Sequence, residues 1–402
     1  MGKYIRFLDF IISIPFAFLL RFRKGKQICL YGFYGAKDAS PIRNQGDNAI
    51  LESILSFVKP LKRPLLLCLL EPNKKYEADG KVVFIKRRGI QIYSQWLAVI
   101  AQSKILVFGG GGLFQDYQGN GGSTHHLWRI NFLFFLANRK IIWWSQGVGP
   151  LPSEKSKKYT TRAASYADMI TLRDEESRQL LLQCGIPSNK LITTADAVYK
   201  LPSTYFKQKS QTSSSSKKTK VGISLFSFYT VAFQDELKNE TLYNEYKTLI
   251  EMLLKQDFIV ELIVMVNTQD AEICLRIQNE FKDQNVSVRG INLSLDEITS
   301  TISDLDVMLA MRYHSYVLSI LAGIPVSAVA YHPKVRSLTS ELNAWEFSSE
   351  IDDVCAKKLY NNILYALKNR TDIIDRQNQL LTNKQDLIHL NEKHLLRILE
   401  AS

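Results

Sequence analysis

The sequence is poor in cysteine and shows no pattern for disulfide pairing or metal binding. Its five cysteines are odd in number, lie far apart and form no C-x-x-C pair. This spacing argues against a disulfide framework and a zinc site, and favours a reducing compartment. The adjacent His125 and His126 do not have the spacing of metal ligands and lack a set of carboxylate partners. We therefore expect neither a metal nor a cofactor.

Apolar runs long enough to span a membrane are also lacking. The apolar stretch from Phe7 to Leu20 contains Asp9 and Pro15 and is shorter than the roughly 18 residues of a spanning helix. No small-residue cleavage site follows it, so a cleaved signal peptide is not expected. Two interpretations remain: an interfacial anchor on an anionic cytoplasmic leaflet, or an amphipathic helix packed on the protein's own surface. We expect a cytoplasmic protein, peripheral on the inner face of the plasma membrane if the first interpretation holds.

The positive charge of the chain is concentrated in two short segments. The net charge is +12 over 402 residues. Residues 1–26 carry six basic side chains against Asp9, and residues 207–220 carry five lysines and no acid. A nucleic-acid-binding protein usually has its basic residues on a folded face, with aromatic side chains for stacking. We therefore predict no nucleic-acid partner; the oligomeric state does not follow from the sequence.

The order of strand-like and helix-like runs predicts two similar halves. Alternating β and α patterns indicate parallel sheets covered by helices, and a Ser/Lys-rich stretch between them reads as a linker. Together they suggest an α/β fold with the two Rossmann-like domains of GT-B glycosyltransferases and a helical C-terminal tail. The predicted divisions are a basic and apolar segment at 1–26, an N-terminal domain at 27–205 on the acceptor side, a linker at 206–220, a donor-side domain at 221–350, and C-terminal helices at 351–402.

The individual elements follow from the same patterns. Strands are expected at 27–33, 64–70, 82–85, 105–108, 140–145, 169–172, 220–225, 259–266, 286–289, 307–310 and 326–330, and helices at 47–58, 90–101, 126–137, 241–255, 270–282, 295–303 and 315–323. Because ligands of open α/β sheets bind at the carboxyl ends of the strands, the active site is expected in the cleft between the halves.

Two polar or glycine-rich stretches follow strands of the first half. Gly109 to Gly112 allow a sharp turn, and their amides could hold an anion, although a tight turn without a ligand is the alternative. The run is not G-x-G-x-x-G, which disfavours a nicotinamide cofactor. Asn44 and Asp47 precede the first helix; Asp47 suits a helix cap, and either side chain could instead face a ligand.

Three cationic positions and one histidine also follow strands. Arg173 can pair bidentately with carboxylate or phosphate, or form a salt bridge with Asp174. Arg312 and His314 open a helix, where the dipole and amides favour an anion and the imidazole could act as a general acid or base. Lys334, after the next strand, is expected beside them, although plain surface charge is the alternative.

Taken in order, these stretches resemble the polysaccharide pyruvyl transferase family. The resemblance covers about Gln27 to Leu338. Two departures lie on the acceptor side: a longer loop at Ala36–Arg43, and Asn48 in place of an acidic residue. The segments that carry the resemblance are Gly32–Gly35, Asn44–Asp47, Phe108–Phe114, Ser145–Pro150, Thr171–Asp174, Ala195–Asp196, Arg312–His314 and Tyr331–Lys334.

The resemblance implies a GT-B-like enzyme that uses phosphoenolpyruvate as donor and forms a pyruvate ketal on a sugar. It places Arg173, His314 and Lys334 at donor-binding and catalytic positions. We expect His314 as general acid and Asp47 as a group that orients or deprotonates the acceptor, a polysaccharide sugar or its lipid-linked precursor. Two alternatives are a nucleotide-sugar glycosyltransferase of the same fold and a non-catalytic glycan-binding protein at the membrane. The expected substrate-binding residues are Arg173, Arg312, Lys334, Asn44, Gly110, Gly111, Gly112 and Gln146.

Overall fold

The chain forms two compact units, each built on a parallel sheet. The computed structural model describes residues 2–33, 44–69, 74–85, 91–207, 218–281 and 285–401. The first unit contains residues 2–33, 47–201 and 384–401, and the second contains residues 44–46, 202–207, 218–281 and 285–383. Ser/Lys-rich residues 208–217 of the predicted linker and the predicted loop 36–43 lie outside the described residues.

The first unit holds an eight-stranded sheet within the described residues. The strand order is β3-β2-β1-β4-β6-β7-β8, with β5 also paired to β6, and all of these neighbouring strands are parallel. Strands β1, β2 and β4 are rich in branched and aromatic residues and are almost fully buried. This is expected of a parallel sheet covered on both faces. The strands are β1 (Gln27–Phe33), β2 (Leu65–Leu69), β3 (Lys81–Phe84), β4 (Ser103–Phe108), β5 (Gly111–Phe114), β6 (Lys140–Val148), β7 (Met169–Leu172) and β8 (Leu191–Thr193).

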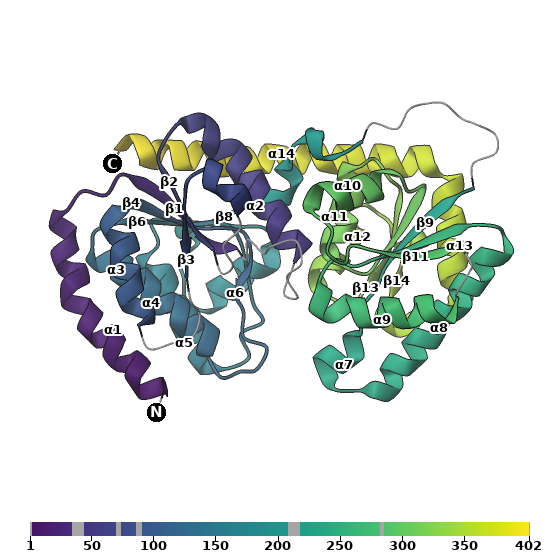
Figure 1. Ribbon diagram of the computed structural model, residues 1–402, viewed down its shortest axis with the longest axis horizontal. Helices are drawn as coiled ribbons and strands as arrows, with labels where there is room; N and C mark the ends of the chain where they lie inside the picture. Colours follow the sequence, from purple (N-terminus) through teal and green to yellow (C-terminus); the bar gives the residue numbers. More distant parts are fainter. Residues whose placement is uncertain are drawn as a thin grey trace. The chain divides into compact units, whose positions relative to one another are not determined.

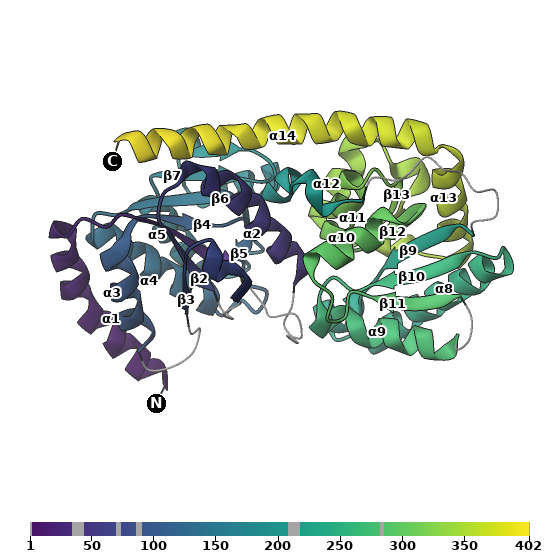
Figure 2. The same cartoon turned by 45° about the horizontal axis from the view of Figure 1, so that its top comes forward.

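Helices α1, α3, α4 and α5 share one hydrophobic core with this sheet. Helix α1 packs against α3 and α4, and the three lie side by side in Figures 1 and 2. None of the helices in the described part of the chain is long and apolar enough to cross a membrane. The helices of this unit are α1 (Gly2–Leu19), α2 (Gln45–Val58, whose first two residues belong to the second unit), α3 (Ile92–Gln102), α4 (Gly122–Leu136), α5 (Glu154–Tyr166) and α6 (Glu175–Gln183).

The second unit holds a six-stranded parallel sheet in the order β11-β10-β9-β12-β13-β14. The chain proceeds outward from β9 on one side and from β12 on the other, so the strand order reverses between β9 and β12. Ligands of open α/β sheets bind beside such a reversal, at the carboxyl ends of the strands. The strands are β9 (Lys220–Ser224), β10 (Ile259–Ile263), β11 (Val286–Arg289), β12 (Val307–Ala310), β13 (Val326–Ala330) and β14 (Ser349–Glu350).

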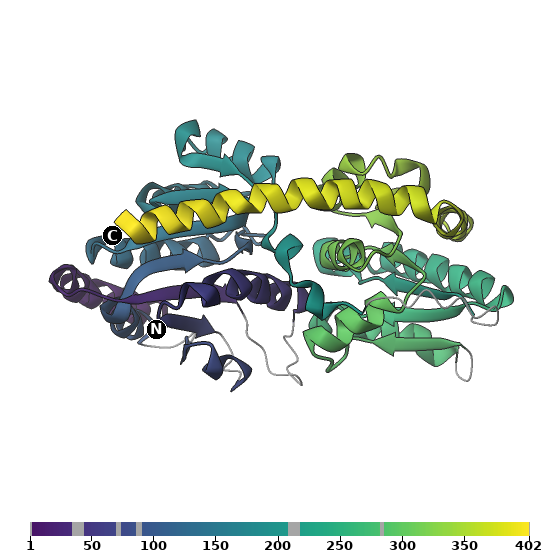
Figure 3. The ribbon, with the colours of Figure 1, turned by 90° about the horizontal axis from the view of Figure 1, so that it is seen from above.

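The chain ends in two helices, the second of which belongs to both units. Helix α14 runs without a break, as Figure 3 shows in yellow. Residues 370–383 count with the second unit and residues 384–401 with the first, where the predicted division kept 351–402 together. The difference arises because Gln385 and Asn391 bond to residues of the first unit, at Tyr199 and Ser145. The helices of the second unit, including α14, which it shares with the first, are α7 (Phe228–Phe233), α8 (Glu236–Lys255), α9 (Asn267–Glu280), α10 (Leu295–Ser303), α11 (Tyr313–Leu321), α12 (Pro333–Glu341), α13 (Ala356–Lys368) and α14 (Arg370–Ala401).

Candidate active site

The turn between β12 and α11 lies at the strand reversal of the second sheet. Its backbone is fastened to the neighbouring strand β9, because the amides of Met311 and Arg312 both donate to Ser224 Oγ at 3.2 Å. Helix α11 begins at Tyr313, two residues earlier than predicted, so His314 is the second residue of the helix. The sequence prediction that Arg312 and His314 follow a strand at a helix amino terminus therefore holds.

Arg312 lies in a nearly closed polar and aromatic environment. Its Nε donates to Asp270 Oδ1 at 3.0 Å, its Nη2 donates to Gln269 Oε1 at 2.7 Å, and its guanidinium carbon lies 3.6 Å from the centre of the Phe226 ring. The Asp270 side chain is fully buried and also accepts the amides of Met265 and Val266. Burial raises the pKa of Asp270 and outweighs the lowering by Arg312 and these amides. The arginine thus ties the β12–α11 turn to the start of α9.

His314 lies against the backbone of the segment that enters α2. A Cβ atom on Gly46 would fall 2.0 Å from His314 Nδ1, so the imidazole occupies the space that any side chain at position 46 would need. The segment is held there because Asn44 forms an antiparallel bridge with Val266 and the Gln45 amide donates to Met265 O at 3.0 Å. The structure therefore places Gly46, two residues after Asn44, against His314 in the second unit.

In the structure Asn44 caps helix α2, whereas the sequence prediction gives that role to Asp47. The Asn44 Oδ1 atom accepts the Gly46 amide at 3.0 Å, whereas Asp47 lies inside the first turn of the helix. An amide oxygen is as good a cap acceptor as a carboxylate, and it is placed one residue before the helix begins. In the first unit, Asp47 Oδ1 lies 3.6 Å from where a Cβ of Gly111 would be.

Lys334 joins the same group of residues in the second unit. It is the second residue of α12, whose cap is His332 Nδ1, the acceptor of the Lys334 amide at 3.3 Å. The Lys334 ammonium lies 5.4 Å from the centre of the Tyr313 ring, and that ring is 5.3 Å from the imidazole of His314. Tyr313, which the sequence prediction did not single out, therefore contacts both the cation and the histidine.

In the first unit Arg173 follows β7, as predicted, and is held by two carboxylates. Its Nη1 donates to Asp196 Oδ2 at 3.1 Å and its Nε to Asp174 Oδ2 at 3.3 Å. The guanidinium packs on the backbone of Gly147, where a Cβ would come within 2.6 Å of it. The salt bridge to Asp174 was the alternative interpretation, but the buried partner, Asp196, is 23 residues away and follows a different strand. Both carboxylates fix the direction of the Arg173 fork.

The glycine run has a structural reason that the sequence did not reveal. Gly111 begins β5 and pairs with Gln146 of β6, and the next helix starts only at Gly122. The predicted anion cradle is therefore not followed directly by a helix amino terminus. Gln146 is fully buried and donates from Nε2 to Gly111 O at 2.5 Å, while Gly109 lies against the ring of Phe33. Substrate binding by Gly110, Gly111, Gly112 and Gln146 stays a prediction.

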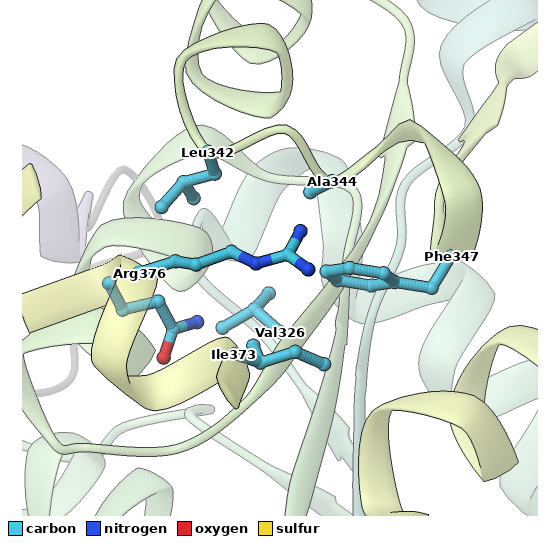
Figure 4. Close-up of a pocket in the computed structure, with 7 residues that line it drawn as sticks. Val326, Leu342, Ala344, Phe347, Ile373 and Arg376 are labelled. Carbon is cyan, nitrogen blue, oxygen red and sulfur yellow. The ribbon is translucent and has the colours of Figure 1, made fainter. Parts of the chain in front are cut away.

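Among the described residues of the second unit, two hollows can be compared with the predicted site. The first is lined by Phe347, Ile373 and Arg376 among others, and Figure 4 shows the arginine running along it; it has no room for a water molecule and adjoins Val326, at the amino end of β13, away from the predicted site. The second, of about 370 Å³, follows the carboxyl ends of β9 and β13 and is lined by aromatic and charged side chains that include Tyr331. Tyr331 packs on Phe226, the ring beneath Arg312, at 4.8 Å. This cavity therefore adjoins the Arg312 environment.

Comparison of the structure with solved proteins defines the class of fold. A HepE protein from Anabaena in complex with UDP-glucose matches with a TM-score of 0.61 at 12% identity, over 94% of this chain and 100% of that one. A putative UDP-N-acetylglucosamine 2-epimerase from Listeria monocytogenes matches with a TM-score of 0.58 at 10% identity, over 88% and 90% of the two chains. A UDP-GlcNAc 2-epimerase from Neisseria meningitidis bound to UDP-GlcNAc gives 0.57 at 12% identity, over 94% and 100%. The predicted GT-B-like fold is confirmed.

The sequence narrows this class to one family. Residues 44–333 match the model of the family described as polysaccharide pyruvyl transferase, and no curated protein sequence matches the chain. The chain therefore belongs to the polysaccharide pyruvyl transferase family. The matched range contains every predicted site residue except Lys334, which follows it directly.

Proposed function

We propose that the protein transfers the pyruvyl group of phosphoenolpyruvate to a sugar of a cell-surface polysaccharide or its lipid-linked precursor, forming a ketal and releasing phosphate. Membership of the pyruvyl transferase family supports a pyruvyl transfer. The observation that carries the donor assignment is the group formed by Arg312, Tyr313, His314 and Lys334 at neighbouring strand ends of the second unit. Phosphoenolpyruvate carries a carboxylate and a phosphate on three carbons, so its binding site requires several cations and amides close together.

The chemistry requires one acid and two nucleophilic hydroxyls. His314 protonates C3 of phosphoenolpyruvate, which makes C2 electrophilic, and one sugar hydroxyl adds to C2. The second hydroxyl then forms its bond to C2 as the C2–O bond to phosphate breaks. The two hydroxyl protons balance the reaction, since one replaces the proton given to C3 and the other leaves with phosphate. In this proposal Lys334 binds a negatively charged group of the donor. Arg312, whose position is fixed by Asp270, also binds the donor.

The first unit would serve the acceptor in the same proposal. Asp47 in the first turn of α2 orients or deprotonates a sugar hydroxyl, and Asn44, which caps this helix, belongs to the second unit. Arg173 of the same unit is assigned to the donor, as the resemblance implies, since its guanidinium, whose direction is fixed by Asp174 and Asp196, suits a carboxylate or a phosphate. Gln146 and Gly110 to Gly112 line the adjoining strand ends.

The reaction can be tested by offering phosphoenolpyruvate with lipid-linked sugars and following phosphate release together with the mass of the product. We expect phosphate and a sugar whose mass rises by one pyruvate ketal. The H314Q variant should lose at least about a hundredfold in turnover, because an amide cannot donate the proton. Near wild-type turnover by H314Q would contradict the role given to His314.

A second candidate is a glycosyltransferase that uses a nucleotide sugar. The observation in its favour is the fold shared with proteins solved with UDP-glucose or UDP-GlcNAc, together with the aromatic-walled cavity of about 370 Å³ beside Tyr331. The same product analysis separates the two, because glycosyl transfer adds a whole sugar and releases a nucleotide. Unchanged substrates in both assays would instead favour a glycan-binding protein.

A further inference from the structure

Helix α1 has an apolar face that the fold of the protein does not use. Leu8 and Ile12 are 56% and 61% exposed, and Leu19 is 61% exposed. In the sequence from residue 7 to residue 20 the only charged residue is Asp9. The exposed large apolar side chains of α1 and of the turn Leu20–Phe22 after it are Tyr4, Phe7, Leu8, Ile11, Ile12, Phe16, Phe18, Leu19 and Phe22.

The opposite face of α1 is fixed to the first unit. Phe10, Ser13 and Ala17, spaced three and four residues apart, are buried against α3 and α4. The carboxylate of Asp9 accepts the Tyr93 amide at 2.6 Å at the start of α3, and the guanidinium carbon of Arg129 lies 4.6 Å from the centre of the Phe10 ring. The prediction that the helix packs on the protein's own surface therefore holds for this face, and the opposite face remains exposed.

An uncharged aromatic and aliphatic helix face is uncommon on the surface of a soluble domain. Single exposed apolar residues are ordinary, but contiguous patches mark sites of contact with a protein or a membrane. The inner face alone accounts for the packing of α1. The outer face therefore calls for a partner with apolar surface.

The charges at the end of this face favour an anionic partner. Arg21, Arg23 and Lys24 follow the apolar residues and are exposed, and none of them forms an ion pair with a carboxylate of the described residues. The Arg21 guanidinium carbon lies 5.0 Å from the Phe18 ring and 6.0 Å from the Phe22 ring, which keeps its charge at the border of the apolar face. Aromatic rings and cations at such a border are typical of helices that lie in a membrane interface.

We propose that the outer face of α1 binds the surface of a membrane that contains anionic lipids. The helix lies in the plane of the interface, with Leu8, Ile12 and Leu19 among the upper acyl chains and Arg21 and Arg23 among the headgroups. A second copy of this chain is the weaker choice of partner, because two such faces would bring the same cations together. The membrane contact does not depend on the reaction proposed above.

The test is flotation of the 402-residue protein with vesicles of phosphatidylcholine alone and of phosphatidylcholine mixed with phosphatidylglycerol. We expect binding to the mixed vesicles that weakens with added salt. The L8S/I12S variant should bind the mixed vesicles at least about tenfold more weakly, since both apolar side chains of the wild type would leave water on binding. The R21E/R23E variant should lose the preference for the anionic vesicles, as each cation near such a surface strengthens binding about fivefold.

The control is L237S on α8, which removes an 80% exposed leucine from the second unit and should float as the wild type does. Phosphate release with a soluble acceptor should be unchanged in L8S/I12S, so a failure of membrane binding and a failure of the proposed reaction are distinguishable. Wild-type flotation by L8S/I12S, or no flotation of the wild type, would overturn the proposal. A wild-type dimer that L8S/I12S dissociates, without vesicle binding, would assign the face to a second copy instead.

Discussion

The contact between Gly46 and His314 predicts a variant that removes activity without removing the fold. In Gly46→Ala the added Cβ would lie 2.0 Å from Nδ1 and 2.5 Å from Cγ and Cε1 of the imidazole. Ordinary contact begins at 3.4 Å, so the ring must move by about 1.4 Å. Gly46 is helical, so alanine itself is favoured there by about 1 kcal/mol.

The size of the effects on stability and on kcat follows from the group that has to move, which is the imidazole of His314. Turning the His314 side chain off its rotamer costs about 0.5–1.5 kcal/mol, which the helix preference of alanine offsets. The free energy of unfolding should therefore change by less than about 1 kcal/mol. A misplacement of about 1 Å costs roughly a hundredfold in rate, so kcat should fall by about that factor.

The assay is phosphate release at saturating phosphoenolpyruvate and acceptor, with thermal unfolding of the same samples. The double variant G46A/H314Q should be no slower than H314Q, because both changes act through one imidazole. The control is G323A at the other end of α11, where φ is +67° and no atom lies within 4 Å of the added Cβ. It should cost about 1 kcal/mol of stability and leave kcat unchanged.

A folded G46A variant with wild-type kcat would refute the reasoning. So would a double variant in which the two losses multiply, since that would mean that Gly46 acts independently of His314.

Three further predictions concern polar groups that are buried or half-buried. In D270N the charge of Arg312 loses its buried partner, and the free energy of unfolding in urea should fall by about 3–5 kcal/mol; a loss below about 1 kcal/mol would show that the pair is dispensable. Burial, and then Arg129, lowers the pKa of His125 to about 4. The unfolded chain therefore binds more protons between pH 6.5 and 4, and stability should be full above about pH 6.5 and fall by about 1–2 kcal/mol as the pH drops through that window; H125Q should flatten the dependence in urea titrations, and an unchanged slope would contradict it. In N391A, Ser145 Oγ loses a 2.7 Å donor, and a loss of about 1–3 kcal/mol is expected in the unfolding of the first unit, with N378A on the same helix as control.

The strands of the two sheets were predictable because they are short, rich in branched side chains and bounded by polar residues. The bounds predicted at 169–172, 286–289, 307–310 and 326–330 agree with the structure to the residue. Helices α5 and α6 were not predicted, because their sequences are largely polar and only a few positions are buried. β5 was missed because glycines disfavour strands, and pairing with β6 overrides that preference.

The candidate site was predictable only as a set of positions after strands. Arg312 and His314 follow β12 as expected, and Lys334 follows β13. The partner of Arg312, Asp270, lies 42 residues away in the sequence, and no local pattern marks it. The same is true of Gly46 beside His314, because that contact depends on the bridge between Asn44 and Val266.

Helix α14 has a consequence for how the protein is made. The first unit needs Asn391, which is fully buried and bonded to Ser145, and Leu395, which is fully buried as well. On the ribosome, residues 2–201 emerge long before these side chains, so the first sheet must wait through the synthesis of the whole second unit for its last packing partners. Domains usually fold in the order in which they are synthesised. Here the second unit is expected to reach its native packing first, and a released chain truncated after residue 383 should carry a protease-resistant second unit beside a protease-sensitive first one.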